Sequence, residues 1–236
     1  MSKKKLFINI IISFVFVIII GTIFYVVNNK IFLYDEIEYG KYYINENEYG
    51  KREKIKWIVI DKNDNSVLLL SKYSLDVIAY DKKKENAKWE ESELREFLNE
   101  KFYDNTFNDS EKKNIIPIER SIKYNDEFET VKDRVSLLSI SDIEKLKIKN
   151  SILESHGTKY AIYKGLYELS DNLVKYYIIN DIKGEEYRYK KKLDKDYDYG
   201  LYGPFAYYSD EFVEANEEWV GLRPIIKVKL VDGKIN

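Results

Sequence analysis

The chain has 236 residues, with 39 Lys and Arg, 41 Asp and Glu, one His and no Cys. The lack of cysteine excludes disulfides, thiolate metal sites and cysteine nucleophiles, and a single histidine argues against a zinc site of the usual kind. Four basic residues lie within residues 1–30, so the remainder has 35 basic and 41 acidic residues and a net charge of −6, whereas nucleic-acid binding needs a concentrated basic surface.

The first expected element is a membrane-spanning helix. Residues 6–27 form a 22-residue run without charge, and as a helix this run would be about 33 Å long, enough to cross a bilayer. Three lysines precede it, and the positive-inside rule places that end in the cytoplasm. The alternative is a cleaved signal peptide, but apolar regions of signal peptides are usually about 7–15 residues long. The sequence therefore predicts a single-pass protein of the cell membrane, with the following parts: a cytoplasmic tail over 1–5, a transmembrane helix over 6–27, a stalk over 28–38 and an extracellular domain over 39–236.

Three strands are expected at the start of this domain. The first covers residues 39–44, and the next two cover residues 55–60 and 67–71. A polar, turn-forming segment separates the second strand from the third, which favours a hairpin. Both runs are apolar on consecutive residues, so we expect the hairpin to be covered on both faces.

Residues 89–117 form the expected centre of the domain and contain two short helices. In the first helix, Leu94, Phe97 and Leu98 share one face, as in a half-buried helix that is capped near Glu90. The second helix begins with a capping box and cannot extend far toward a proline: these residues are Asn108, Glu111 and Pro117. The aromatic residues between the two helices are expected to pack them together: Phe102, Tyr103 and Phe107.

The rest of the chain adds weaker signals. In order we expect a polar connection, a strand, a helix, a buried strand, a long loop and a closing segment with a strand, over residues 119–132, 135–140, 141–149, 176–180, 185–207 and 219–231. Ser141 and Glu144 would form a capping box for the helix. In the closing strand, apolar residues alternate with Lys227 and Lys229, which leaves one face in water. Strands interrupted by helices without βαβ alternation predict an α+β domain with mainly antiparallel pairing.

Four motifs occur in a recognisable order, namely W-E-x-S-x-L-R-x-F-L-N, F-x-x-x-E-K, D-R-V-x-L-L-S and G-L-R-P. They cover residues Trp89–Asn99, Phe107–Lys112, Asp133–Ser139 and Gly221–Pro224. In these motifs the chain resembles a large bacterial family of domains of unknown function, over nearly everything after residue 38. That family is similar to C-type-lectin-like and formylglycine-generating-enzyme-like domains, so the resemblance implies such a fold.

The resemblance does not extend to the activities of these domains. The family commonly has a W-[WY]-L-R-S strand before the closing motif, and the corresponding Tyr176–Asn180 lacks its arginine and serine. Formylglycine-generating enzymes use cysteines to bind copper, and this chain has none. The calcium motifs of lectins are absent as well.

One segment offers a candidate metal site. Asp194, Asp196 and Asp198 place carboxylates on alternate residues, with Gly200 shortly after, as calcium loops often do. The glycine is one residue late for an EF-hand, so a hydrated acidic loop is the alternative. No other cofactor is expected. The same region suggests an aromatic surface for sugar stacking, formed by Tyr197, Tyr199, Tyr202, Tyr207 and Tyr208.

Other chemically interesting residues favour structural roles. His156 follows Ser155, but adjacency in the sequence does not provide the geometry of a catalytic pair, so we interpret it as an exposed loop histidine. Arg95 and Arg223 are the two motif arginines. We expect each to hydrogen-bond buried carboxylate or carbonyl groups, with binding of an anionic ligand as the alternative.

Taken together, these observations predict a membrane-anchored extracellular domain without catalytic residues. Its expected function is to bind or scaffold an unidentified ligand or protein of the cell envelope. The first alternative is an envelope hydrolase with paired carboxylates, which would need a cleft holding two convergent acids. The second is a purely structural partner in a membrane complex.

Overall fold

The computed structural model describes residues 35–45, 51–83, 87–124, 127–169, 171–179, 181, 205–207 and 218–235. The chain divides into two units, residues 1–35 and 36–236, and every element below lies in the second. Within the described part of the chain, no helix is long and apolar enough to cross a membrane. The charge-free run over residues 6–27 lies outside that part.

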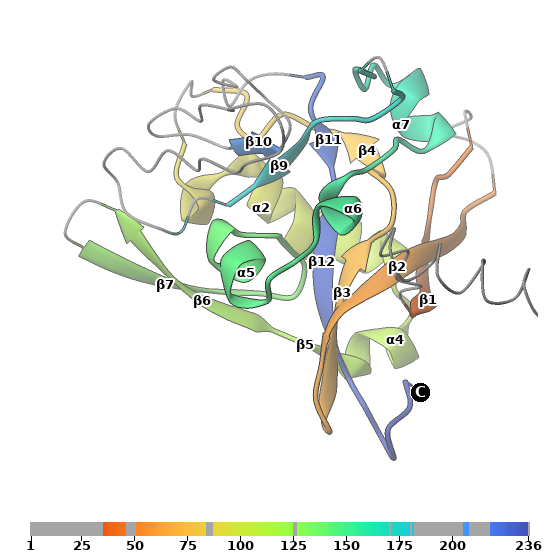
Figure 1. Cartoon of the computed structure of the whole chain (residues 1–236), viewed down its shortest axis with the longest axis vertical. Coiled ribbons are helices and arrows are strands. Elements are labelled where there is room, and N and C mark those ends of the chain that lie inside the picture. Colours follow the sequence, from red (N-terminus) through yellow and green to blue (C-terminus); the bar gives the residue numbers. More distant parts are fainter. Residues whose placement is uncertain are drawn as a thin grey trace, which may run out of the picture. The chain divides into compact units, whose positions relative to one another are not determined.

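The main sheet is antiparallel and curled (Figure 1). Its strands follow the order β1-β2-β3-β12-β5, and β8 also pairs with β12. Their bounds are Glu36–Tyr42 for β1, Glu53–Lys62 for β2, Ser66–Ser71 for β3, Ile115–Ile116 for β5, Ser136–Leu137 for β8 and Pro224–Lys229 for β12. The predicted hairpin is confirmed as β2 and β3. In β3 the consecutive residues Leu69 and Leu70 are both fully buried, so this strand is covered on both faces.

A smaller sheet has the order β10-β9-β11-β4. These strands span Phe205–Tyr207, Tyr176–Ile178, Gly221–Leu222 and Asp76–Val77, in that order. Only β9 and β11 pair in parallel among the strands described. The chain passes from β11 into β12 through Arg223, so the last segment joins the two sheets. The domain is therefore α+β with mainly antiparallel pairing, as the sequence predicts.

The helical centre is one longer run of helical turns. It consists of the 3₁₀ turn η1 (Trp89–Glu91), α2 (Glu93–Phe97), the π-helical turn η2 (Leu98–Phe102) and α3 (Tyr103–Thr106). The predicted cap near Glu90 is wrong, because the side chain of Ser92 caps α2 by accepting a hydrogen bond from the Arg95 N–H at 3.2 Å. Leu94 and Leu98 are fully buried, as their shared face predicts. The run continues to Thr106, so Phe102 and Tyr103 lie within it instead of after it.

The capping box of the second helix is confirmed in α4 (Asp109–Asn114). The Asn108 side chain accepts hydrogen bonds from the N–H groups of Ser110 and Glu111, and the Glu111 carboxylate accepts from the Asn108 N–H. In Figure 1, α4 lies beside β1. The Gly40 N–H of β1 donates to the same carboxylate at 3.1 Å, which fastens the helix to the sheet.

Two predictions between residues 118 and 149 are wrong. The expected polar connection is an antiparallel ribbon, β6 (Ile118–Tyr124) with β7 (Glu127–Asp133), which extends to the left in Figure 1. Ile122 and Val131 are buried on one side of the ribbon, while many of its other side chains are polar. The next helix, α5 (Ile140–Lys145), is capped by Ser139 and Asp142, not by Ser141 and Glu144.

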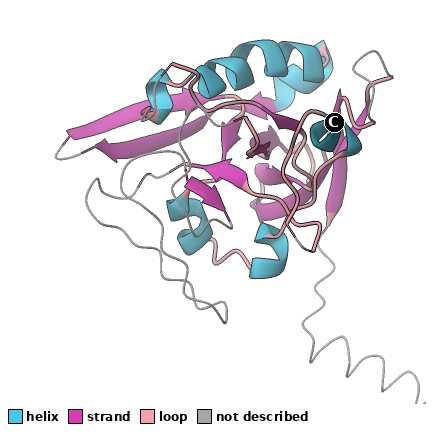
Figure 2. Ribbon diagram, turned by 90° about the horizontal axis from the view of Figure 1, so that it is seen from above, coloured by secondary structure: helices cyan, strands magenta, loops and turns pink. Residues whose placement is uncertain are grey.

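Two further helices complete the domain, α6 (Asn150–Leu153) and α7 (Lys159–Tyr163). Helices lie on both sides of the strands (Figure 2). The main hydrophobic core is formed by residues of both strands and helices. It includes Trp57 of β2, Trp89 and Phe102 of the helical run, and Ile226 of β12, each essentially inaccessible to solvent.

Candidate ligand pocket

A pocket of about 480 Å³ lies between β1, β4, the helical run and α7. This volume is typical of sites that bind small molecules. Its walls combine aromatic side chains with charged groups of both signs, and each element contributes a different part of them.

Asp76 is the most buried charged group in the pocket, with an exposed fraction of only 2%. It lies on β4, and the backbone of this strand pairs with β11. The Lys164 ammonium lies 2.7 Å from Asp76 Oδ1, and the Val77 N–H donates to the same oxygen at 2.7 Å. The Tyr42 hydroxyl donates to Oδ2 at 2.5 Å. The carboxylate therefore fixes the positions of a lysine from the end of α7 and a tyrosine from β1.

Tyr42 is held in its protonated form. Burial is the largest reason that the pKa of its phenol is far above the usual value, and the Asp76 carboxylate raises this pKa further. A negative phenolate beside a buried carboxylate would be strongly unfavourable. Tyr42 therefore acts as a hydrogen-bond donor in the pocket.

Aromatic rings form the apolar part of the pocket: Tyr42, Tyr43, Phe97, Phe102 and Tyr160. Ring centroids are 5.3 Å apart for Tyr43 and Tyr160 and 5.0 Å for Tyr42 and Phe102, both within the range of favourable aromatic pairs. Tyr43 and Phe97 are only partly buried. They offer apolar surface to a ligand.

The π-helical turn helps to shape this wall. Phe97, Lys101 and Asn105 all line the pocket and come from the helical run, spaced four residues apart. Such spacing places side chains on one face of a helix. Turns of π-helix within α-helices are frequently found at functional sites.

The charges of the described residues that line the pocket do not balance. Asp76 is paired with Lys164, and Glu218 is paired with Lys82 at 3.1 Å. Two further cations line the pocket, Arg52 and Lys101. The Arg52 guanidinium donates to the backbone carbonyl of Asn105, which is neutral, and the Lys101 ammonium has no ion pair with a described residue. Among the described residues that line the pocket, cations therefore outnumber carboxylates, although the domain as a whole is acidic.

The metal candidates Asp194, Asp196 and Asp198 lie outside the described residues, so the predicted calcium site stays a prediction. Most of the proposed tyrosine surface also lies outside them, and of Tyr207 only the strand β10 is described. Among the described residues, no group of three His, Asp or Glu side chains could hold a metal ion.

His156 is exposed, as predicted. Its Nδ1 lies 2.8 Å from the carbonyl oxygen of Asn172. The Ser155 hydroxyl is buried and lies 3.4 Å from the Ser74 hydroxyl. The structure therefore places the histidine ring against backbone and the serine against another serine.

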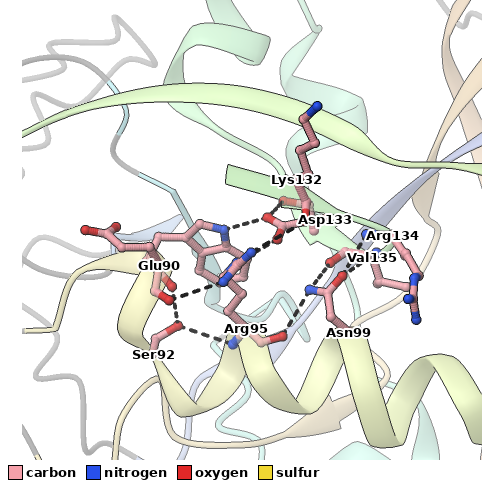
Figure 3. A network of polar contacts seen from close by, with 10 residues as sticks. Glu90, Ser92, Arg95, Asn99, Lys132, Asp133, Arg134 and Val135 are labelled. Atoms are coloured by element: carbon pink, nitrogen blue, oxygen red, sulfur yellow. Dashed lines mark hydrogen bonds and ion pairs between the residues drawn. The ribbon is translucent and has the colours of Figure 1, made fainter. Parts of the chain in front are cut away.

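The two motif arginines have the structural contacts that were expected. The Arg95 Nε donates to Asp133 Oδ1 at 2.6 Å (Figure 3). The Trp89 indole donates to the other oxygen of this fully buried carboxylate at 2.8 Å. The Asn99 side chain in turn bonds the backbone of Val135. These contacts join the helical run to the end of β7 and to the residues that follow it.

Sequence reasoning missed the pocket residues as a group. Asp76, Lys164 and Glu218 belong to no motif, and they lie far apart in the chain. The available signals were the aromatic residues around Tyr42, which lie in the first expected strand, and Phe97, which was expected on the buried face of a helix.

Comparison with known proteins gives one match. The model of the family described as "Domain of unknown function (DUF6273)" matches residues 64–230. No curated protein and no solved structure gives a significant match. The match covers Asp76, the helical run, α7 and Glu218 of the pocket, while Tyr42, Tyr43 and Arg52 precede it. Since it spans well over half of the chain, this protein belongs to the DUF6273 family of domains of unknown function.

Proposed function

We propose that this protein is a membrane-anchored, non-catalytic binding module whose pocket takes a small anionic ligand. The observation that supports this function is the excess of cations over carboxylates among the described lining residues, beside aromatic side chains. Arg52 and Lys101 have no carboxylate partner among the described residues, and a carboxylate or phosphate of a ligand would supply one. The rings beside them would cover the apolar part of the same ligand.

A hydrolase is less well supported by this pocket. Glycoside hydrolysis uses two carboxyl groups that converge on one bond of the substrate. Among the described residues, the carboxylates that line the pocket are Asp76 and Glu218, and a lysine engages each of them. Asp76 also accepts hydrogen bonds from Tyr42 and Val77, which favours a positioning role.

The membrane anchor over residues 6–27 and the relationship to C-type-lectin-like domains are part of the same proposal. The relationship is supported by the closing strand β12, which follows Arg223 and lies inside the main sheet between β3 and β5. An experimental structure whose core superposes on neither C-type-lectin-like nor formylglycine-generating-enzyme-like domains would refute this relationship.

Titration calorimetry on the full chain in detergent, with cyclohexanecarboxylate as the probe, tests the anion site. We expect saturable binding that weakens as salt concentration rises, because salt screens charge attraction near a surface. The double variant Arg52→Ala/Lys101→Ala should bind about tenfold more weakly, as the loss of charge-assisted contacts predicts.

The matched control is Lys113→Ala, which removes an exposed helical lysine outside the pocket. It should bind cyclohexanecarboxylate like the wild type. Equal affinity in the double variant and the wild type would show that these cations do not form an anion site.

A further inference from the structure

We infer that the ligand of this pocket is a hydroxyl-rich anion, namely a sugar that bears a carboxylate or a phosphate. This inference rests on the proposed anion-binding function and adds the chemical class of the ligand. The hydroxyl groups are inferred from three features of the pocket, namely the ion pairs, the exposed Asn105 amide and the angles between the rings, and the acidic group is inferred from Arg52 and Lys101.

The ion pairs are suited to hydroxyl groups. A hydroxyl donates one hydrogen bond and accepts up to two, so it can bridge a carboxylate and an ammonium group that lie side by side. Asp76 and Lys164 provide such a pair at 2.7 Å, and Lys82 and Glu218 provide another at 3.1 Å. An ionised carboxylate has about four acceptor positions, and Asp76 uses three of them for Tyr42, Val77 and Lys164. Both Asp76 and the Lys164 ammonium therefore retain hydrogen-bonding capacity.

Asn105 adds an amide with both donor and acceptor atoms. Its side chain lines the pocket and is exposed, and among the described residues it forms no hydrogen bond. Its backbone carbonyl accepts a hydrogen bond from Arg52. An amide can bond two neighbouring hydroxyls of a sugar at once, because its oxygen accepts while its nitrogen donates.

The ring angles favour a sugar over a flat aromatic anion. The planes of Tyr43 and Tyr160 are inclined by 35°, and those of Phe97 and Phe102 by 53°. Neither pair forms a parallel slot that would clamp a flat ring on both faces. A sugar needs only one aromatic face for its C–H groups, while its hydroxyls bond elsewhere.

The acidic group of the ligand is inferred from the two remaining cations of the pocket. Arg52 and Lys101 are exposed at the pocket and have no carboxylate partner among the described residues. A carboxylate or a phosphate satisfies both cations equally well by this chemistry. The experiment described next distinguishes a ligand carboxylate from a ligand phosphate.

The test measures affinities by titration calorimetry, with the full chain in detergent. The probes are D-glucuronate, D-galacturonate, D-glucose 6-phosphate, neutral D-glucose and cyclohexanecarboxylate, which has the ring and the charge without ring hydroxyls. At least one sugar acid or the sugar phosphate should bind at least about tenfold more tightly than either glucose or cyclohexanecarboxylate. Glucose lacks the charge that pairs with the cations, and cyclohexanecarboxylate lacks the hydroxyls that form the hydrogen bonds. Preference for a uronate or for the phosphate identifies the acidic group.

Two variants separate the contributions of hydroxyl and charge. Asn105→Ala should weaken the preferred sugar several-fold and leave cyclohexanecarboxylate unchanged, whereas Lys101→Ala should weaken both. Lys113→Ala again serves as the control and should change neither. If cyclohexanecarboxylate binds as tightly as every sugar probe, the sugar inference is overturned and the anion site stands. If no anion binds, the proposed function fails too.

Discussion

At the scale of single residues, Arg223 shows how a buried charge can hold a fold together. Its side chain is fully buried between the two sheets. The guanidinium donates to the carbonyl oxygens of Ser71, Ile152 and Leu153 at 2.9, 2.7 and 2.9 Å, and to the Tyr176 hydroxyl at 3.1 Å. A planar group with donors in several directions suits these spread acceptors better than an ammonium group would.

We therefore expect Arg223→Met to lower the free energy of unfolding by about 3–5 kcal/mol, because buried acceptors lose their donors. Arg223→Lys should also be clearly destabilising, since one ammonium cannot reach all of them. Denaturant midpoints of the full chain measure both effects. Arg134→Met, at an exposed arginine, is the control and should cost less than about 1 kcal/mol. An Arg223→Met midpoint equal to this control would contradict the structural role.

At the scale of elements, the helical run connects the core with the pocket. One face buries Leu94 and Leu98 completely, while Phe97, Lys101 and Asn105 line the pocket. The same helix therefore stabilises the domain and positions ligand-facing groups. Its π-helical turn contains residues of both kinds, since Leu98 is buried and Lys101 lines the pocket.

Leu98→Ala should lower the free energy of unfolding by about 2–5 kcal/mol, because it leaves a cavity in a packed core. Glu96→Ala changes an exposed position of the same run and should have an effect within about 0.5 kcal/mol. Urea denaturation of both variants against the wild type tests this. Similar midpoints for all three proteins would mean that Leu98 is not in the core.

The contact between α4 and β1 should make stability depend on pH. Burial alone would raise the pKa of Glu111, but hydrogen bonds from the Asn108 N–H, the Lys54 ammonium and the Gly40 N–H together lower it below its usual value. A lowered pKa in the folded state means that the stabilisation is fully present above the usual carboxyl pKa, about 4.3, and is lost as the pH falls through the folded value.

Glu111→Gln should accordingly destabilise the protein at pH 6 and have a much smaller effect near pH 3. Denaturant midpoints of both proteins at the two pH values give the comparison. Glu119→Gln, at an exposed carboxylate of β6, is the control for general effects of charge. A difference between wild type and Glu111→Gln that is the same at pH 6 and pH 3 would exclude this linkage.

At the scale of the whole molecule, the proposed topology places the N-terminus in the cytoplasm and the domain outside. Intact cells treated with a protease that cannot enter should lose the domain over residues 39–236, while a cytoplasmic marker survives. Protection of the domain in intact cells, with digestion only after lysis, would reverse the proposed orientation. A mature protein that begins near residue 28 would instead indicate a cleaved signal peptide.

The sequence by itself determined the features that depend on neighbouring residues. The Asn108 and Glu111 capping box formed as predicted, because its two hydrogen bonds lie within four residues. The hairpin of β2 and β3 formed because its apolar strands flank a short polar turn. The ribbon of β6 and β7 was missed, since many of its side chains are polar and resemble those of a loop.

Only the tertiary structure decided which polar side chains meet. Ser139 replaced Ser141 as the cap of α5, a choice made among closely spaced serines that local pattern could not resolve. Asp76, Lys164 and Tyr42 come from three separate elements, and no spacing in the sequence connects them. A carboxylate in the sequence is equally compatible with water, an ion pair or a ligand. Burial and the arrival of distant partners select among these, and both arise only when the sheets and helices pack together.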